Sequence, residues 1–546
     1  MKKRNLIIYS IIGAAGAVLA TASPQYEAAR KILTAESAIA QLYVDTVNEI
    51  RLAEDAIRGM LEGLDPHSSY STPEETKELN EPLQGNFSGI GITFNMNQDT
   101  LYVIQTVAGG PSEKVGILAG DRIVAVNDTS IAGQKMKNSD IMKRLRGPKG
   151  TKVDVMILRG KEQIPFRITR DDIPIYSVDA SYMVDEETGY IRLNKFSADT
   201  PAEMRKSLSE LKKQGMKNLV LDLTDNGGGY LQAAVDVLGE LLEPGALAVY
   251  TEGLKSPRNN NYAHPHGRKP ILDDGRLVVM LNQYSASASE ITAGAIQDWD
   301  RGLVVGRRSF GKGLVQRPIT FDDGSMIRLT IAHYYTPTGR DIQKPYTKGD
   351  SKSYNHDIVD RFENGELMHA DSLKYNDSLR VQTLKLHRNI YGGGGIYPDS
   401  FVPLDTMENT KYYRNIMAKG LLNRYVISYV DANRKRITSK YKTADDFVEH
   451  FEVTPEMIGD LIEMGNADGV DFNQEEFNRS EPLFRMIIKA LIGRDIYDNS
   501  TYFKVYNRHD PIFKEAVRLI GSDDYPLLLG PGPVLPESYQ NNHNED

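Results

Sequence analysis

Residues 282–316 read N-Q-Y-S-A-S-A-S-E-I-T-A-G-A-I-Q-D-W-D-R-G-L-V-V-G-R-R-S-F-G-K-G-L-V-Q, and the rest of the chain is interpreted around this stretch. The apolar run Leu277–Leu281 before it predicts a buried strand, and the spacing of apolar residues after Glu290 predicts a helix. A second short strand is predicted at Leu303–Gly306. A strand that turns into a helix presents its turn residues at the helix N-terminus, where unpaired N–H groups and the dipole favour negative charge.

Such a turn suits a nucleophilic serine, because an oxyanion formed there is stabilised. A serine also needs a base, and no histidine is close in sequence. Lys312 follows after one helix and one strand, a path that can return it to the serine, but it acts as a base only if burial lowers its pKa. Taken alone, Ser287-x-x-Glu290 is better explained as a structural capping box, and Lys312 as a surface charge.

The block S-A-S-A-S-E…F-G-K-G-L-V-Q resembles the carboxyl-terminal processing, or tail-specific, proteases, which are Ser/Lys peptidases. The resemblance assigns the nucleophile to Ser287, the general base to Lys312 and an orienting role to Gln316. Ser285 and Ser289 are then packing or hydrogen-bonding neighbours. Gln316 would contact Lys312 directly only if the chain between them made a helical turn, because on a strand they would lie roughly 13 Å apart.

A glycine turn follows another predicted buried strand, Asn218–Leu223, and reads T-D-N-G-G-G-Y-L over residues 224–231. No Walker-type lysine follows the glycines, so nucleotide binding is disfavoured. The resembling family has an Asn-Pro-Gly-Gly turn here, which supplies one oxyanion donor. The resemblance therefore implies an oxyanion hole made by the amides of Gly228 and Ala288, with Gly227 in place of the usual proline. Thr224 stands where the family often has an arginine, so any ion pair of that arginine would be missing.

Residues 83–174 change to short strands and glycine turns, and G-N-F-S-G-I-G-I-T-F at 85–94 resembles the carboxylate-binding loop of a PDZ domain. In such a loop, backbone N–H groups hold a terminal carboxylate and the peptide adds as a strand to the sheet edge. A small β-domain without a ligand is the alternative. Arg170 either couples this domain to the core or is a surface arginine. The resemblance assigns peptide binding to Phe87, Gly89, Ile90, Gly91, Ile92, Met142 and Leu145.

Composition excludes several classes of function. The net charge of −9 disfavours nucleic acid as a partner. The absence of cysteine excludes cysteine catalysis, disulfides and thiolate zinc sites. His264 and His266 are separated by a proline and have no third ligand nearby, so an exposed loop is favoured over a metal site. No cofactor or metal is expected.

The N-terminus predicts export. Met1-Lys-Lys-Arg-Asn is basic, Leu6–Ala22 is an uncharged and mostly apolar run, and Ala20-Thr-Ala22-Ser resembles a cleavage site. The run is short for a membrane-spanning helix. We expect a periplasmic or cell-envelope protein in which residues 1–22 are a signal peptide or, less favoured, a membrane anchor.

The expected fold class is α/β: the resemblance implies a ClpP/crotonase-like β/β/α protease core with an inserted PDZ domain, N-terminal helices and a C-terminal helical region. The polar segment 346–390 departs from the family as an insertion; we expect it to run over the surface, either restricting substrates or inert. The expected parts are a signal peptide or anchor (1–22), N-terminal helices (25–82), the PDZ domain (83–174), the core (175–404), the C-terminal helices (405–528) and a flexible tail (529–546).

The function implied by the resemblance is a serine endopeptidase that recognises protein substrates by their free C-termini. One alternative is a non-catalytic PDZ scaffold whose protease-like core only binds peptides. Another is a crotonase-like acyl-CoA enzyme, against which the PDZ-like segment and the export signal both speak. Helical stripes in 405–528 are typical of a packed core, and a homo-oligomer or a regulatory partner stays open.

Overall fold

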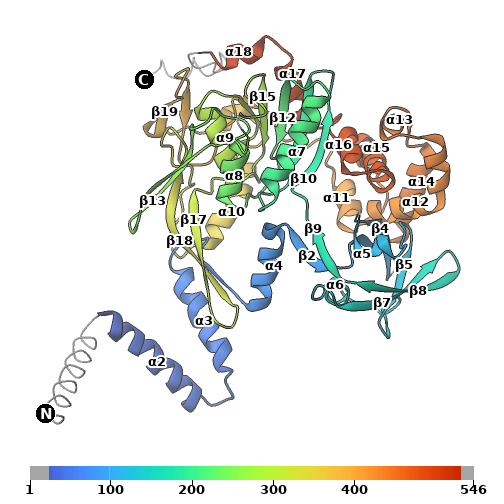
Figure 1. Cartoon of the computed structure of the whole chain (residues 1–546), viewed down its shortest axis with the longest axis horizontal. Helices are drawn as coiled ribbons and strands as arrows, with labels where there is room; N and C mark the ends of the chain where they lie inside the picture. Colours follow the sequence, from blue (N-terminus) through green and yellow to red (C-terminus); the bar gives the residue numbers. More distant parts are fainter. Residues whose placement is uncertain (1–23, 98, 108, 268, 531–546) are drawn as a thin grey trace. The chain divides into compact units, whose positions relative to one another are not determined.

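The computed structural model describes residues 24–530 except residues 98, 108 and 268 (Figure 1). The chain forms two compact units. The smaller unit comprises Met1–Thr76, Gln316–Thr330 and Tyr346–Asn355, and the larger comprises Lys77–Val315, Ile331–Pro345 and His356–Asp546. Within the described residues no helix is both long and apolar enough to cross a bilayer, and the run Leu6–Ala22 lies outside them.

Among its described residues, the smaller unit includes helices α2 (Pro24–Leu42) and α3 (Glu49–Glu62), followed by strand β1 (Ser69–Ser71). β1 pairs antiparallel with the first residues of β18 (Met326–Tyr335), and β17 (Leu314–Thr320) pairs with β18. Asp65 fixes the turn before β1, because its Oδ1 accepts hydrogen bonds from the backbone of Ser68 at 3.0 Å and from the Thr330 hydroxyl at 2.8 Å.

The larger unit is built on a six-stranded sheet in the order β10-β11-β12-β15-β16-β21. β10 pairs antiparallel with β11, and the other neighbours are parallel. Every residue of β15 is buried, as expected for a central parallel strand. The strands are β10 (Val178–Met183), β11 (Thr188–Leu193), β12 (Asn218–Asp222), β15 (Leu277–Leu281), β16 (Leu303–Gly306) and β21 (Ser400–Phe401).

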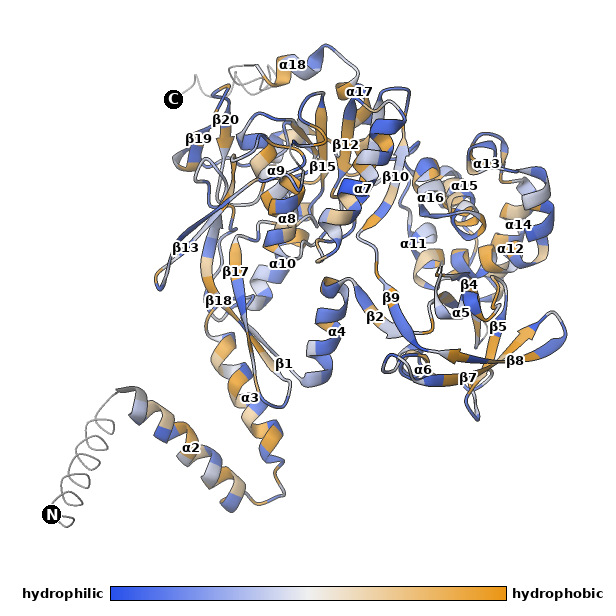
Figure 2. Ribbon diagram, viewed as in Figure 1, coloured by the Kyte–Doolittle hydropathy of each residue, from blue (hydrophilic) through white to orange (hydrophobic). Residues whose placement is uncertain are grey.

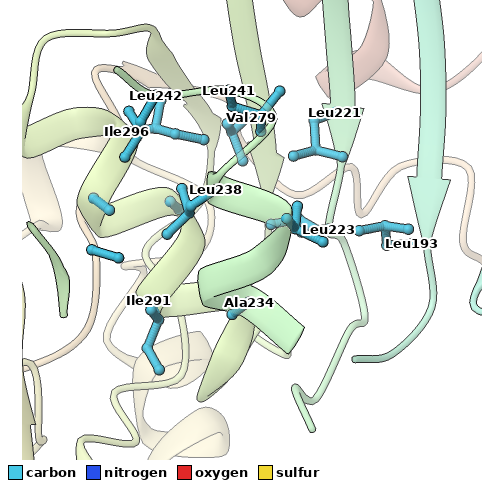
Figure 3. Close-up of a cluster of buried hydrophobic side chains, with 14 of the residues drawn as sticks. Leu193, Leu221, Leu223, Ala234, Leu238, Leu241, Leu242, Val279, Ile291 and Ile296 are labelled. Carbon is cyan, nitrogen blue, oxygen red and sulfur yellow. The ribbon is translucent and has the colours of Figure 1, made fainter. Parts of the chain in front are cut away.

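Successive side chains on these strands point to opposite faces of the sheet and belong to two hydrophobic cores, one on each face. Leu221 and Val279 pack in a cluster with helices α7 (Thr200–Lys213), α8 (Leu231–Leu238) and α9 (Ala288–Asp298), as Figure 3 shows for Leu238 and Ile296. Val220 and Val278 pack on the opposite face with α17 (Pro511–Ile520). Figure 2 shows the hydrophobic colouring of β12 and β15 that two-sided burial requires.

A hairpin and the insertion complete the protease-like part. β13 (Leu247–Gly253) and β14 (Ser256–Tyr262) form an antiparallel pair, and Tyr250 of β13 lies opposite Tyr335 of β18. The segment 346–390 is structured rather than a plain surface excursion. It contains helix α10 (Ser351–Glu363), the 3₁₀ turns η1 (Ala370–Ser372) and η2 (Asp377–Leu379), and strand β19 (Arg380–Gln382), which pairs with β20 (Asn389–Tyr391).

The PDZ-like part is a sheet in the order β3-β4-β5-β7-β8, with β6 beside β5 and helices α5 (Pro111–Lys114) and α6 (Asn138–Leu145). Strand β2 (Asn86–Gly89) pairs with β9 (Asp171–Pro174), where the chain enters and leaves it. Helix α4 (Pro73–Gln84) precedes β2. The remaining strands are β3 (Ile92–Asn97), β4 (Thr100–Thr106), β5 (Arg122–Val126), β6 (Thr129–Ser130), β7 (Lys152–Arg159) and β8 (Glu162–Thr169).

The C-terminal helices form a core of their own, which includes the fully buried Phe447 and Phe484. The last helices do not join it, because α17 packs on the central sheet and Tyr525 of α18 (Asp524–Leu528) belongs to the same cluster as α17. The helices of the separate core are α11 (Lys411–Ala418), α12 (Leu421–Lys440), α13 (Ala444–His450), α14 (Pro455–Ala467), α15 (Gln474–Ile496) and α16 (Asn499–Tyr506).

Candidate active site

Ser287, the predicted nucleophile, lies on the turn between β15 and α9 with φ 58° and ψ −113°. A non-glycine residue with positive φ costs about 1–3 kcal/mol and persists only where its surroundings hold it. α9 supplies that hold, since all its residues are buried and each fully buried isoleucine, such as Ile291 or Ile296, contributes about 1.5–3 kcal/mol. The serine is therefore fixed at the helix N-terminus, with its side chain partly exposed.

Glu290, one turn into α9, is completely buried and links the serine to the predicted base. Its Oε2 accepts hydrogen bonds from the backbone N–H of Ser287 at 2.8 Å and of Lys312 at 2.9 Å. Because both donors contact one oxygen atom, the two backbone nitrogens lie within twice a hydrogen-bond length of each other. A single carboxylate oxygen thus brings together two residues that a helix and a strand separate in the chain.

The other oxygen of Glu290 holds the loop that leads to Lys312. Oε1 accepts from the Ser309 hydroxyl at 2.5 Å and from the Gly311 N–H at 2.7 Å. Burial raises the pKa of Glu290 to about 6, and these hydrogen bonds act in the opposite direction by favouring the charged form. At neutral pH the carboxylate therefore predominates, and its two oxygens accept from all four donors.

Tyr334 of β18 and Gln343 support the same loop. The Tyr334 hydroxyl lies within hydrogen-bond distance of the carbonyl oxygens of Ser287, at 3.2 Å, and Lys312. The Gly313 N–H donates to Gln343 Oε1 at 2.8 Å. A Cβ on Gly313 would lie 2.7 Å from the Gln343 backbone nitrogen, so only glycine allows this close packing directly after Lys312.

The glycine turn after β12 lies directly against the predicted nucleophile. Gly228 has φ +97°, and a Cβ built on it would lie 2.7 Å from Ser287 Cβ and 2.8 Å from the Ala288 nitrogen. Ala288 is the first residue of α9, so its N–H has no partner within the helix. The Gly228 N–H, however, donates to Asn226 Oδ1 at 2.9 Å. The two residues assigned to the oxyanion hole are neighbours, and their role stays a prediction.

Asn226 fastens this turn to the end of β11 and to the start of α9. Its side-chain nitrogen donates to the Leu193 carbonyl at 2.9 Å, and its own carbonyl accepts from the Ser289 hydroxyl at 2.8 Å and from the Ala286 N–H at 3.0 Å. Ser289 therefore has the hydrogen-bonding role expected of it. Ser285 has one too, because its hydroxyl donates to the Leu223 carbonyl at 2.8 Å.

Thr224 stands where an arginine was expected from the family, and an arginine from another strand, Arg192, reaches this position. Arg192 of β11 donates to Asp222 Oδ2 at 2.5 Å and to the hydroxyl and carbonyl of Thr224 at 2.7 and 3.0 Å. Arg192 lies opposite Asp222 in the parallel register of β11 and β12. A neighbouring strand therefore supplies the cation beside the glycine turn.

Gln316 lies on strand β17, so residues 312–316 do not form a helical turn. The Gln316 carboxamide donates to the Thr330 hydroxyl at 3.2 Å. Its orienting role stays a prediction.

The residues assigned to peptide binding differ in exposure. Ile90 and Leu145 are 3% and 4% exposed and belong to the PDZ core, whereas Met142 on α6 is 36% exposed. Phe87 of β2 is partly buried, and the Arg146 guanidinium lies 4.4 Å from its ring centre. Gly89 and Gly91 flank Ile90 in a tight loop, since a Cβ on either would meet side-chain atoms at 3.0 Å; Ile92 begins β3.

Arg170, the candidate coupling residue, is 9% exposed and fastens the end of α6. It donates to the carbonyls of Leu145 at 2.9 Å and of Arg144 at 2.8 Å. The next residue begins β9, in which Ile173 lies opposite Phe87 of β2. Arg170 thus ties the predicted groove helix to the junction strand, and a role in coupling stays a prediction.

Sequence reasoning missed two residues of this site, Glu290 and Arg192. The motif Ser287-x-x-Glu290 pointed only to a local cap, and nothing in the sequence signals that the same carboxylate binds a loop beyond the next strand. Arg192 could be found only from the strand register. As for metals, the described residues contain no group of three or more His, Cys, Asp or Glu side chains that could hold an ion.

Comparison with known proteins identifies the class of this protein. The family model of peptidase family S41 matches residues 187–353, and that of a PDZ domain matches 88–169. The N-terminal domain of the activating protease CtpB matches 14–76, and a family of unknown function, DUF8443, matches 412–498. Together with the curated relatives below, these matches show that the chain belongs to the carboxy-terminal-processing serine proteases of family S41.

The carboxy-terminal-processing protease of Bartonella bacilliformis is 36% identical over 307 residues, which are 55% of this chain and 69% of that protein. A probable CtpA-like serine protease of Staphylococcus epidermidis is 35% identical over 54% of this chain and 58% of its own length. The predicted family and the predicted fold class, an S41 protease core with a PDZ domain, are confirmed.

Two solved structures are similar over parts of the chain. The photosystem II D1 C-terminal processing protease is 32% identical with a TM-score of 0.33, over 57% of this chain and 89% of that one. The PDZ domain of a carboxy-terminal protease from Vibrio cholerae, in complex with peptide, is 30% identical with a TM-score of 0.16, over 16% of this chain and 99% of that one.

Proposed function

We propose that this protein is an endopeptidase that binds the free C-terminus of a protein substrate at its PDZ domain and cleaves the chain with Ser287 and Lys312. The observation that carries the proposal is the shared hydrogen-bond acceptor, Glu290 Oε2, which keeps the backbones of the two residues next to each other. An extended lysine side chain is long enough to reach a hydroxyl on such a neighbouring residue. Export of the protein is part of the proposal and is supported by the N-terminal pattern at Leu6–Ala22.

In the proposed reaction the neutral amine of Lys312 takes the hydroxyl proton of Ser287, and Ser287 Oγ bonds to the scissile carbonyl carbon. The resulting oxyanion lies at the N-terminus of α9, with the N–H of Ala288 and an amide of the glycine turn as donors. The C–N bond then breaks as the Lys312 ammonium returns its proton to the leaving amine. Water then gives a proton to Lys312 as its oxygen bonds to the ester carbonyl carbon. The Lys312 ammonium passes this proton to Ser287 Oγ as the ester C–O bond breaks, which restores both side chains.

Binding of the substrate's C-terminus is supported by the match to a PDZ domain and by the tight loop at Gly89 and Gly91. A PDZ loop holds the terminal carboxylate through backbone N–H groups. Amidation of the C-terminus removes the charge, and it should therefore weaken binding without altering the scissile bond.

The test is mass spectrometry of a model protein with a flexible apolar tail, incubated with the full chain, with its C-terminus free or amidated. We expect cleavage of the free form and at least about a tenfold higher KM for the amidated form, since a charge-assisted contact contributes about 1.5–3 kcal/mol. Equal cleavage of both forms would reject recognition of the carboxylate. Binding of the tail without any cleavage would favour the non-catalytic scaffold instead.

A further inference from the structure

The insertion is joined to the loop that carries Lys312 by a buried polar cluster. The cluster consists of Arg361 at the end of α10, Glu366 just after it, and Arg308 of the loop. Arg361 is 3% exposed, and the side chains of Arg308 and Glu366 are 11% and 12% exposed. Charged side chains are rarely buried to this extent unless they are paired, so the cluster is a specific structural feature.

Glu366 bridges the two arginines. Its carboxylate accepts two hydrogen bonds from Arg308, at 2.8 and 2.7 Å, and one from Arg361 Nε at 2.8 Å. Burial alone would raise the pKa of Glu366, but the hydrogen bonds and charges of both arginines outweigh it and lower the pKa. Glu366 is therefore charged at neutral pH and holds both guanidinium groups in place.

Arg361 uses its other nitrogens on the backbone of the loop. Nη2 donates to the Arg308 carbonyl at 2.7 Å, and Nη1 donates to the Ser309 carbonyl at 3.1 Å. The planar fork of a guanidinium can reach two successive carbonyls in this way, whereas a lysine presents a single point of charge. The insertion thus binds the main chain at the residue whose hydroxyl donates to Glu290.

Asp357 makes a second contact between the insertion and the neighbourhood of this loop. Its carboxylate accepts from Lys344 Nζ at 2.9 Å, and the Lys344 side chain is 4% exposed. The same Nζ lies 4.1 Å from the centre of the Phe310 ring, and the Lys344 N–H donates to the Gly311 carbonyl at 2.9 Å. The insertion therefore holds residues 308 and 309 directly through Arg361, and residues 310 and 311 through Lys344, which it binds with Asp357.

We propose that Arg361 and Glu366 are positioning residues for catalysis, which act by fixing loop 308–312 so that Lys312 stays in register with Ser287. This inference rests on the proposed function, because it gives the insertion a role in the Ser287–Lys312 reaction. It departs from the two roles considered for the insertion, a barrier to substrates and an inert excursion. The chain of contacts runs from Arg361 through Ser309 to Glu290 Oε1, while Oε2 of Glu290 binds Ser287 and Lys312.

The test compares Arg361→Lys and Glu366→Gln with the wild-type full chain in the cleavage assay. We expect kcat to fall by about tenfold to a hundredfold, because displacements near 1 Å at a reacting group have effects of about that size. KM and the affinity for a fluorescent peptide with a free C-terminus should stay within twofold, since the PDZ domain is not altered. The acid limb of the kcat profile should also move, because the surroundings of Lys312 change.

Lys385→Met is the matched control. Lys385 lies in the same insertion and forms an ion pair with Glu243 at 2.7 Å, but both side chains are about half exposed or more, so its loss should leave kcat unchanged. Wild-type turnover and its loss in Ser287→Ala are measured first, which separates failure of this inference from failure of the proposed function. An unchanged kcat in a folded Arg361→Lys variant would overturn the inference, as would a rise in KM alone.

Discussion

The backbone amides of Ser287 and Lys312 donate to the same atom, Oε2 of the buried Glu290, at 2.8 and 2.9 Å. The strand-to-helix turn and the glycine-flanked loop are thus registered against each other by a single carboxylate. The geometry of the predicted Ser287–Lys312 dyad is therefore not set by the Lys312 side chain alone. The protein fixes both backbones, and only the lysine side chain has to be placed.

Glu290→Gln tests that link. A carboxamide has one acceptor oxygen and an NH₂ group that would face N–H donors, so about two of the four donors would lose their acceptor. Each buried unsatisfied donor costs about 1–3 kcal/mol. We expect the free energy of unfolding in urea to fall by about 2–5 kcal/mol and kcat to fall more than tenfold.

Glu243→Gln is the control for that substitution, because the Glu243 side chain is 75% exposed and its ion pair with Lys385 should contribute little. Equal kcat and equal urea midpoints for Glu290→Gln and the wild type would show that the shared acceptor does not hold the site.

Gly228→Ala and Gly227→Ala form a second matched pair. A methyl group on Gly228 would lie 2.7 Å from both Ser287 Cβ and the Ala286 carbonyl oxygen, at a φ of +97° that disfavours alanine. Gly227 has no atom within 4 Å of the added carbon. We expect Gly228→Ala to lose at least tenfold in kcat and about 1–3 kcal/mol of stability, and Gly227→Ala to change either little. Indistinguishable variants would contradict the close packing of the turn on Ser287.

Asp510→Asn tests how the free energy of unfolding depends on pH through a carboxyl group near Arg192. Burial, and then the nearby charge of Asp222, raises the pKa of Asp510 to about 6. The folded state therefore holds this proton more tightly than the unfolded chain does. The stability that Asp510 contributes is present at low pH and is lost as the pH rises through about 6. Asparagine keeps the oxygen that accepts the Ile512 N–H at 2.9 Å, so the helix cap is retained.

The measurement is urea unfolding of both forms at pH 4 and pH 7. Relative to Asp510→Asn, the wild type should lose about 2 kcal/mol between these pH values. A constant difference, or a wild type that gains stability relative to the variant, would contradict the raised pKa.

The strands of the core could be predicted because their apolar runs are short, continuous and bounded by turn residues. Leu277–Leu281 and Leu303–Gly306 are strands with the predicted bounds, and the strand predicted at Asn218–Leu223 ends one residue earlier. The positions of Ser287 and Gly228 at ends of such strands then followed from local patterns. Two-sided burial also explains why these strands carry no alternation of polar and apolar residues.

Long-range polar contacts could not be predicted. The register of β11 on β12 places Arg192 beside Thr224. A local sequence pattern does not specify how two strands align when a helix separates them in the chain. The insertion was expected at the surface because its composition is polar, yet Arg361 and Arg388 are 3% and 5% exposed there. Burial of charge depends on partners that come from elsewhere in the chain, such as the Ser309 carbonyl for Arg361 and Asp399 for Arg388.

The Ser287–Lys312 reaction is tested most directly by the turnover of a model protein with a free C-terminus by Ser287→Ala and by Lys312→Ala, followed by mass spectrometry. We expect each variant to fold, with a wild-type near-ultraviolet circular dichroism spectrum, and to lose at least about a thousandfold in kcat. Cleavage at the wild-type rate by either folded variant would contradict the Ser287–Lys312 mechanism.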